Sequence, residues 1–208
     1  MTQDRPLYIA VEGPIGVGKT TLVRRLAARM GGRVVLEIVE ENPFLARFYE
    51  DRERYAFQTQ LFFLMSRFRQ QSELLQADLF RPDIVADYHL LKDRIFARLT
   101  LSDDELGLYE RVYQSLETQI LKPDVLVYLH APIDVLLQRI AKRGRPFEQA
   151  FDAGYLTTLA ETYRHFFAHY HAVPVLSVNN ADLDYANEEK PLDWIHNEIR
   201  RLAGLPPE

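Results

Sequence analysis

The chain has 208 residues, of which 47% are hydrophobic and 26% charged, a balance that suits one globular domain with a real core. It has no cysteine, which excludes disulfides and cysteine-bound metals, and its formal net charge of −5 argues against broad electrostatic binding to nucleic acid. Because no apolar run approaches the roughly 20 residues of a membrane span, we expect a cytoplasmic protein with neither nucleic acid nor membrane as a partner.

Short apolar runs alternate with longer helical patterns along the chain. The predicted strands cover residues 7–11, 34–38, 84–86, 125–129 and 173–178. Helices are predicted over residues 19–30, 53–75, 132–142, 152–170 and 192–202, and another begins after Ser102, where Glu105 three residues later completes a capping box. This alternation predicts parallel βαβ units, and hence an open, doubly wound α/β sheet of five strands with ligands at their carboxyl ends.

A phosphate-binding motif follows the first predicted strand and precedes the first predicted helix. It matches G-x-x-x-x-G-K-[ST] with Gly13, Pro14, Ile15, Gly16, Val17, Gly18, Lys19 and Thr20. The glycines allow backbone N–H groups to turn toward phosphate oxygens, Lys19 bridges phosphates, and Thr20 can hold Mg²⁺. The motif predicts a nucleotide site, to which we also assign Thr21.

A basic cluster follows the fourth predicted helix. Two segments that would indicate other nucleotide-hydrolysing classes, Asn-Lys-x-Asp of GTPases and Leu-Ser-Gly-Gly-Gln of ABC-type ATPases, do not occur in the sequence. Instead the chain has Arg143, Gly144 and Arg145, and Arg139 lies four residues before Arg143 on the same helical face. Arginines beside a glycine suit a lid that closes over transferring phosphates, although a solvated basic helix end would look the same. Beside a phosphate loop, we favour the lid.

Three carboxylates stand at the ends of predicted strands. Glu37 ends the second strand, and Asp87 follows the buried run 84–86 in a Walker-B-like arrangement; both are candidate Mg²⁺ ligands beside Thr20. Asp124 precedes its strand and so points to the opposite edge of the sheet. A transfer of phosphate to a hydroxyl requires a carboxylate that orients the hydroxyl and accepts its proton, and Glu37 and Asp87 are the two contenders.

Five further segments share a specific order and spacing. They are Glu37-Ile38-Val39-Glu40-Glu41-Asn42-Pro43-Phe44-Leu45, Phe57-Gln58-Thr59-Gln60, Ser66-Arg67, Ala86-Asp87-Tyr88-His89 and Lys142-Arg143-Gly144-Arg145-Pro146-Phe147-Glu148-Gln149. With the phosphate loop they resemble the deoxynucleoside kinase family, in particular its bacterial deoxyguanosine and deoxyadenosine kinases, as far as Tyr163. The resemblance implies a single three-layer α/β/α P-loop kinase domain over 1–208 with a five-stranded parallel sheet and a short arginine-rich lid at 143–150. It also implies ATP and Mg²⁺ as cofactors and a homodimer, for which the long helix over 53–75 could supply a face.

The resemblance further implies how the sugar and the phosphates are held. Glu37 would be the carboxylate on the 5′-hydroxyl, and Tyr49 and Glu148 would bind the 3′-hydroxyl. The lid arginines would be Arg139, Arg143 and Arg145. Asp87 corresponds to the acid of the family's Asp-Arg-Ser or Glu-Arg-Ser motif. As a reading of the sequence alone, an ordinary half-buried tyrosine explains Tyr49 equally well.

On the base side, the resemblance implies that Gln60 reads the base edge and that Arg67 lies beside the base pocket with Asp93. Gln60 and Arg67 share one helical face, where a partly exposed polar stripe would look identical. The chain departs from many family members at Tyr88, where they have arginine, so the phosphate or 5′-oxygen contact of that arginine must be absent or supplied elsewhere. The Asp-Tyr-His triplet that results resembles the deoxyguanosine branch, which favours a purine.

Taken together, these patterns predict an ATP-dependent kinase that phosphorylates the 5′-hydroxyl of a small deoxynucleoside, deoxyguanosine or deoxyadenosine, in nucleoside salvage. Two alternatives stay open. A nucleoside-monophosphate kinase also has a phosphate loop and an arginine lid, and a nucleotide-sensing module would bind without turnover.

Overall fold

The computed structural model describes residues 5–39, 41–76, 82–145 and 152–207. All five predicted strands are present in one parallel sheet of order β2-β3-β1-β4-β5. Their bounds are β1 (Tyr8–Glu12), β2 (Arg33–Val35), β3 (Ile84–Ala86), β4 (Val125–His130) and β5 (Val175–Asn179). In the centre of the sheet, Ile9 lies opposite Val85 on one side and Val125 on the other. The carboxyl ends of the strands therefore meet at one edge, where open α/β sheets bind their ligands.

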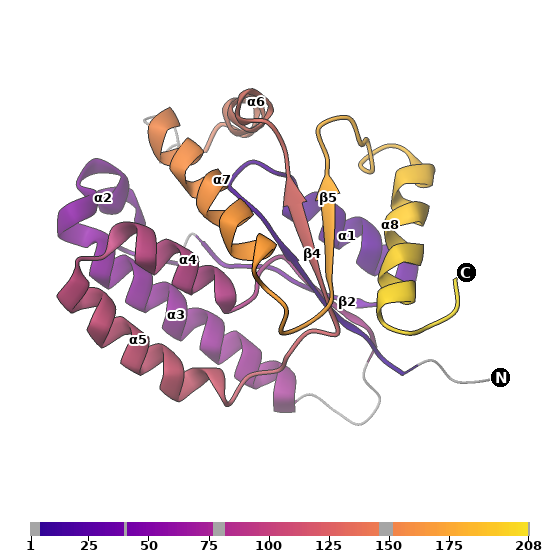
Figure 1. The fold of residues 1–208 in the computed structure, drawn as a ribbon, viewed down its shortest axis with the longest axis horizontal. Coiled ribbons are helices and arrows are strands. Elements are labelled where there is room, and N and C mark those ends of the chain that lie inside the picture. The colour runs from indigo at the N-terminus through magenta and orange to yellow at the C-terminus, as the bar shows by residue number, and fades with distance from the viewer. Residues whose placement is uncertain (1–4, 40, 77–81, 146–151, 208) are drawn as a thin grey trace.

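Helices cover both faces of this sheet. They are α1 (Lys19–Met30), α2 (Leu45–Glu50), α3 (Arg52–Gln76), α4 (Leu91–Thr100), α5 (Asp103–Glu117), α6 (Ile133–Arg143), α7 (Ala153–Ala168) and α8 (Glu189–Leu202). Figure 1 shows α1 and α8 on one side, and α7 and α4 on the other with α3 and α5 outside them. This is the three-layer α/β/α arrangement that the sequence predicts. In the described part of the chain, no helix is both long and apolar enough to cross a bilayer.

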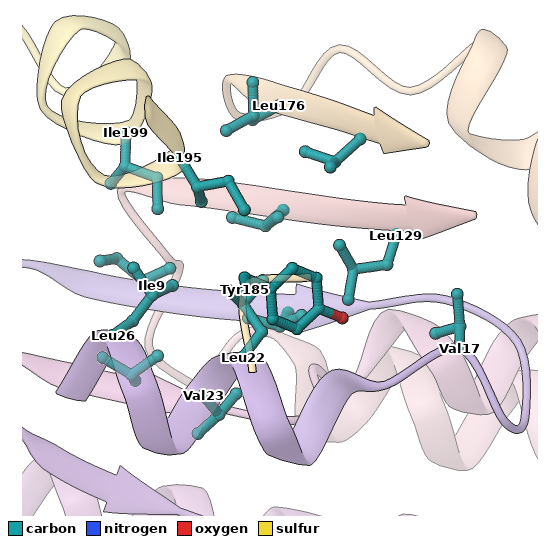
Figure 2. Close-up of a cluster of buried hydrophobic side chains, with 14 of the residues drawn as sticks. Ile9, Val17, Leu22, Val23, Leu26, Leu129, Leu176, Tyr185, Ile195 and Ile199 are labelled. Atoms are coloured by element: carbon teal, nitrogen blue, oxygen red, sulfur yellow. The ribbon is translucent and has the colours of Figure 1, made fainter. Parts of the chain in front are cut away.

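Two apolar cores hold the layers together. On one face, Ile9 of β1, Leu22 of α1 and Ile195 of α8 belong to a cluster of fully buried side chains (Figure 2). On the other face, the rings of Tyr128 and Phe167 stack with centroids 4.5 Å apart in a second cluster. Each buried side chain of this size contributes about 1.5–3 kcal/mol. β1 is buried along its whole length because both faces of a parallel sheet are covered, and this fixes the loop that follows it.

The structure corrects some predicted boundaries. β2 ends at Val35, so Glu37 lies two residues beyond the strand instead of within it. Two helices, α2 and α4, were not predicted. The capping box before α5 is confirmed, with Glu105 accepting the backbone N–H of Ser102 at 3.0 Å. Asp124 lies at the opposite edge of the sheet, as predicted, where it accepts the N–H of Tyr8 at 2.8 Å.

Candidate active site

The predicted phosphate loop connects β1 to α1. Its three glycines, Gly13, Gly16 and Gly18, have positive φ angles of 148°, 82° and 99°, which disfavour other residues. Lys19 opens α1 and folds back over the loop, donating to the carbonyl oxygens of Gly13 at 2.7 Å and Pro14 at 3.1 Å. A strand, a glycine turn and a helix N-terminus are thus assembled as phosphate binding requires.

Gly13→Ala is expected to lower the free energy of unfolding by about 1–3 kcal/mol. A Cβ at this position would lie 2.3 Å from the carbonyl oxygen of Leu129, and the φ angle is unfavourable for alanine. Urea denaturation measures the change. The matched control is Gly107→Ala in α5, where a Cβ meets nothing within 4 Å and helix propensity favours alanine. Equal effects of the two substitutions would contradict the prediction.

Asp87 connects two parts of the site. It follows β3, and its Oδ2 accepts a hydrogen bond from the Thr20 hydroxyl at 2.7 Å, while its Oδ1 accepts the backbone N–H of Glu37 at 2.7 Å. A hydroxyl and a carboxylate this close are hard oxygen ligands that suit Mg²⁺. The described residues contain no group of three or more potential metal-ligating acids or histidines. A Mg²⁺ ion at Thr20 and Asp87 would therefore need nucleotide phosphates to complete its coordination.

Glu37 is held between two cations. Its side chain is only 9% exposed; Oε1 accepts from the Arg67 guanidinium, and Oε2 accepts from Lys92 Nζ at 2.5 Å. Burial alone would raise the pKa of this carboxyl, but Arg67 and Lys92 outweigh burial and hold the pKa below its ordinary value. Glu37 is therefore ionised at neutral pH, as a proton acceptor must be.

Of the side chains predicted to bind the base and the sugar, Arg67 contacts Glu37 directly. Arg67 of α3 is 3% exposed, pairs with Asp93, and lies over the Phe63 ring at 4.8 Å from its centroid. Asp93 is fully buried at the start of α4. Gln60 donates to the Thr100 hydroxyl at 3.3 Å. The cleft is lined by Tyr49, Gln60 and Arg67, whereas Asp93 supports Arg67 from within the protein.

Arg139 is fixed to the phosphate loop. From α6, its Nη1 donates to the Val17 carbonyl at 3.3 Å and to Asn180 Oδ1 at 3.1 Å, and its Nη2 donates to the Asn180 carbonyl at 3.0 Å. Arg143 and Arg145 also line the cleft. Residues 146–150 of the predicted lid, which include Glu148, lie outside the described residues, as does Glu40.

These groups meet in one cleft of about 770 Å³ at the carboxyl ends of the strands. The volume is within the ordinary range for small-molecule sites. Its walls include most of the predicted site residues: Ile15, Gly16, Gly18, Lys19, Thr20, Thr21, Glu37, Tyr49, Gln60, Arg67, Asp87, Arg139, Arg143 and Arg145. Glu37 thus faces the same cavity as the phosphate loop, which an acid acting on a phosphoryl acceptor requires.

Sequence reasoning missed two charged groups at this site. Glu12, the last residue of β1, is 1% exposed and accepts the His89 N–H at 2.6 Å; burial raises its pKa. Lys92 is 8% exposed on the first turn of α4. Burial and the neighbouring Lys92 lower the pKa of Lys19 to about 8, although Glu12 partly opposes them. A signal was present for Glu12, which directly precedes the first loop glycine, whereas Lys92 is one charged residue among several in its segment.

The chain is similar to proteins of known activity. A family model described as deoxynucleoside kinase matches residues 9–203. Deoxyguanosine kinase of Bacillus subtilis is 41% identical over 157 residues, which are 75% of this chain and 76% of that protein. Deoxyadenosine/deoxycytidine kinase of the same species is 33% identical over 199 residues, 92% of this chain and 90% of that protein. A structure of deoxyadenosine kinase from M. mycoides with bound dATP superposes with a TM-score of 0.80 at 26% identity, covering 93% of this chain and 99% of that chain.

Proposed function

The chain belongs to the deoxynucleoside kinase family and is a phosphotransferase, and we propose that it moves the γ-phosphoryl group of ATP to the 5′-hydroxyl of deoxyguanosine or deoxyadenosine in nucleoside salvage. The observation that carries this proposal is the ionised Glu37 carboxylate on the wall of the cleft that the phosphate loop opens into. The purine preference is supported by relatives named for deoxyguanosine and deoxyadenosine.

The proposed reaction follows from the positions of the charged groups. Glu37 accepts a hydrogen bond from the 5′-hydroxyl and aims it at the γ-phosphorus. As the 5′-oxygen bonds to that phosphorus, the bond to the β,γ-bridging oxygen breaks, ADP leaves, and the hydroxyl proton passes to the carboxylate. Lys19, the loop amides and the arginines Arg139, Arg143 and Arg145 neutralise the charge on the phosphates.

We assign the role of proton acceptor to Glu37 and the role of metal ligand to Asp87. Both Asp87 oxygens already accept hydrogen bonds, from Thr20 and from the Glu37 backbone, which places Asp87 beside the helix that begins at Lys19. Glu37 Oε1 accepts a hydrogen bond from Arg67 and Oε2 accepts one from Lys92, and each oxygen has a second lone pair that can face the substrate. Bound by Thr20 and Asp87 together with phosphate oxygens, Mg²⁺ would supply positive charge to the transferred group.

A substrate panel tests the proposal. We expect ADP formation from ATP with deoxyguanosine or deoxyadenosine, with the 5′-monophosphate as the second product. The control arms are dGMP and dTMP, which a nucleoside-monophosphate kinase would use in preference to free nucleosides. Tight nucleotide binding without turnover on any of the four deoxynucleosides would instead identify a sensing module and reject the proposed activity.

We propose a homodimer built on the outer helices. Met65 of α3 and Leu108 of α5 are large apolar side chains that are 48% and 53% exposed, on helices that pack against each other. Apolar side chains of this size on neighbouring helices favour burial in an interface.

Because the reaction draws on intracellular ATP and nucleosides, we also propose that the enzyme acts in the cytoplasm.

A further inference from the structure

Lys92 is a buried cation inside the cleft. It lies on the first turn of α4, is 8% exposed, and lines the same cavity as the phosphate loop. Its Nζ is 2.5 Å from Glu37 Oε2. A lysine is almost never buried without a partner, because desolvation of an ammonium costs several kcal/mol. The partner that compensates for the burial of Lys92 is thus Glu37, the carboxylate that we propose as the proton acceptor.

The charges around Glu37 balance only when Lys92 is counted. Arg67 pairs with two acids, Glu37 and Asp93, so one guanidinium serves two carboxylates. Lys92 adds the second positive charge and makes this buried group of four neutral. Without Lys92 the buried group would carry an uncompensated negative charge, and Glu37 Oε2 would lose the donor that lies 2.5 Å away.

Lys92 and Lys19 of the phosphate loop line the same cavity. The positive charge of Lys92 lowers the pKa of Lys19, so the two ammonium groups act on each other. The charged groups that face Glu37 are Arg67 from α3, Lys92 from α4, Asp87 after β3 and Lys19 from the loop. Of these, Arg67 and Lys92 hold one carboxylate oxygen each and so fix its plane.

Tyr88 does not supply a positive charge beside Glu37. Tyr88, directly after Asp87, is fully buried, and its hydroxyl has no hydrogen-bond partner in the described parts of the chain. The positive charge beside Glu37 comes instead from Lys92, on the first turn of α4. We propose that Lys92 is a positioning residue for phosphoryl transfer, whose ammonium holds the Glu37 carboxylate in the orientation that receives the 5′-hydroxyl.

This inference rests on the proposed function, and a variant series tests it. Lys92→Met keeps most of the aliphatic stem and removes the charge, Lys92→Arg keeps the charge, and Lys122→Met removes an exposed lysine as the matched control. We expect kcat at pH 7 to fall about 10- to 100-fold in Lys92→Met, with KM for ATP unchanged. Lys92→Arg should restore most of kcat, and Lys122→Met should match the wild type.

The division of the effect between kcat and KM separates positioning from a merely structural role. A residue that only maintains the fold would change the free energy of unfolding together with both kinetic constants. Loss of the contact between Lys92 Nζ and Glu37 Oε2 should instead lower kcat while KM for ATP stays the same. If Lys92→Met does not fold, Lys92→Gln carries the same expectation.

The outcomes distinguish the inference from the function. Wild-type kcat in a folded Lys92→Met or Lys92→Gln enzyme would overturn the role of Lys92 and leave the kinase activity standing. A wild-type enzyme that turns over no nucleoside would overturn the proposed function and, with it, the inference.

Discussion

Glu37→Gln is expected to lower kcat for deoxynucleoside phosphorylation by about 10²- to 10⁴-fold, the usual contribution of a general base. The amide is nearly the same size as the carboxylate but has no charge and cannot take the proton of the 5′-hydroxyl. ATP should still bind, because the loop amides and Lys19 are unchanged. Steady-state kinetics give kcat, and nucleotide titration gives the dissociation constant for ATP.

The matched control is Glu41→Gln, four residues along the chain. The Glu41 side chain is 49% exposed and lies 3.6 Å from Arg69 at the surface, away from the cleft. It should keep the wild-type kcat. If the Glu37→Gln enzyme folds and turns over at the wild-type rate, Glu37 is not the proton acceptor, and Asp87 is the remaining candidate.

Arg67→Met is expected to lower the free energy of unfolding by about 3–5 kcal/mol, the cost of breaking a buried ion pair on one side. Arg67 is 3% exposed and pairs with Glu37 and Asp93, so its removal leaves buried negative charge without its main partner. The loss should become smaller as pH falls, because the pKa of Glu37 rises without Arg67 and a protonated acid tolerates burial better. Denaturant unfolding at several pH values measures both effects.

Arg69→Met on the same helix is the control for Arg67. The Arg69 side chain is 65% exposed, and exposed ion pairs contribute little to stability. The free energy of unfolding of this variant should therefore hardly change. The double variant Arg67→Met with Asp93→Asn should lose less than the sum of its parts, since the second change removes an acid that the first leaves unpaired. Strict additivity, or equal effects of Arg67→Met and Arg69→Met, would contradict the ion-pair explanation.

Much of the fold follows from local sequence patterns. Buried parallel strands are apolar runs, and for that reason the strands at the centre of the sheet were predicted close to their observed bounds. The edge strand β2 is mostly exposed and ends three residues before its predicted end. The bounds of α1 agree with the prediction because Gly18 and Gly31, both at positive φ, flank the helix. The phosphate loop is equally local, since its glycines, Lys19 and Thr20 are contiguous.

The parts that were missed depend on tertiary contacts. α2 has six residues, too few for a helical period to be recognised. α4 buries Lys92 and Asp93 among its apolar residues, and two charges on a buried face hide the amphipathic pattern. They are buried because they pair with Glu37 and Arg67, which are 55 and 26 residues away. No spacing rule within one element can indicate such a pairing.

The double role of Asp87 bears on how this enzyme can be redesigned. Its one carboxylate accepts hydrogen bonds from Thr20 of the phosphate loop and from the backbone of Glu37, so a substitution there would release both segments at once. Mutant libraries made to accept new nucleoside analogues should keep Asp87, directly after β3, constant. Substitutions should be introduced on α2 and α3, where Tyr49 and Gln60 line the cleft.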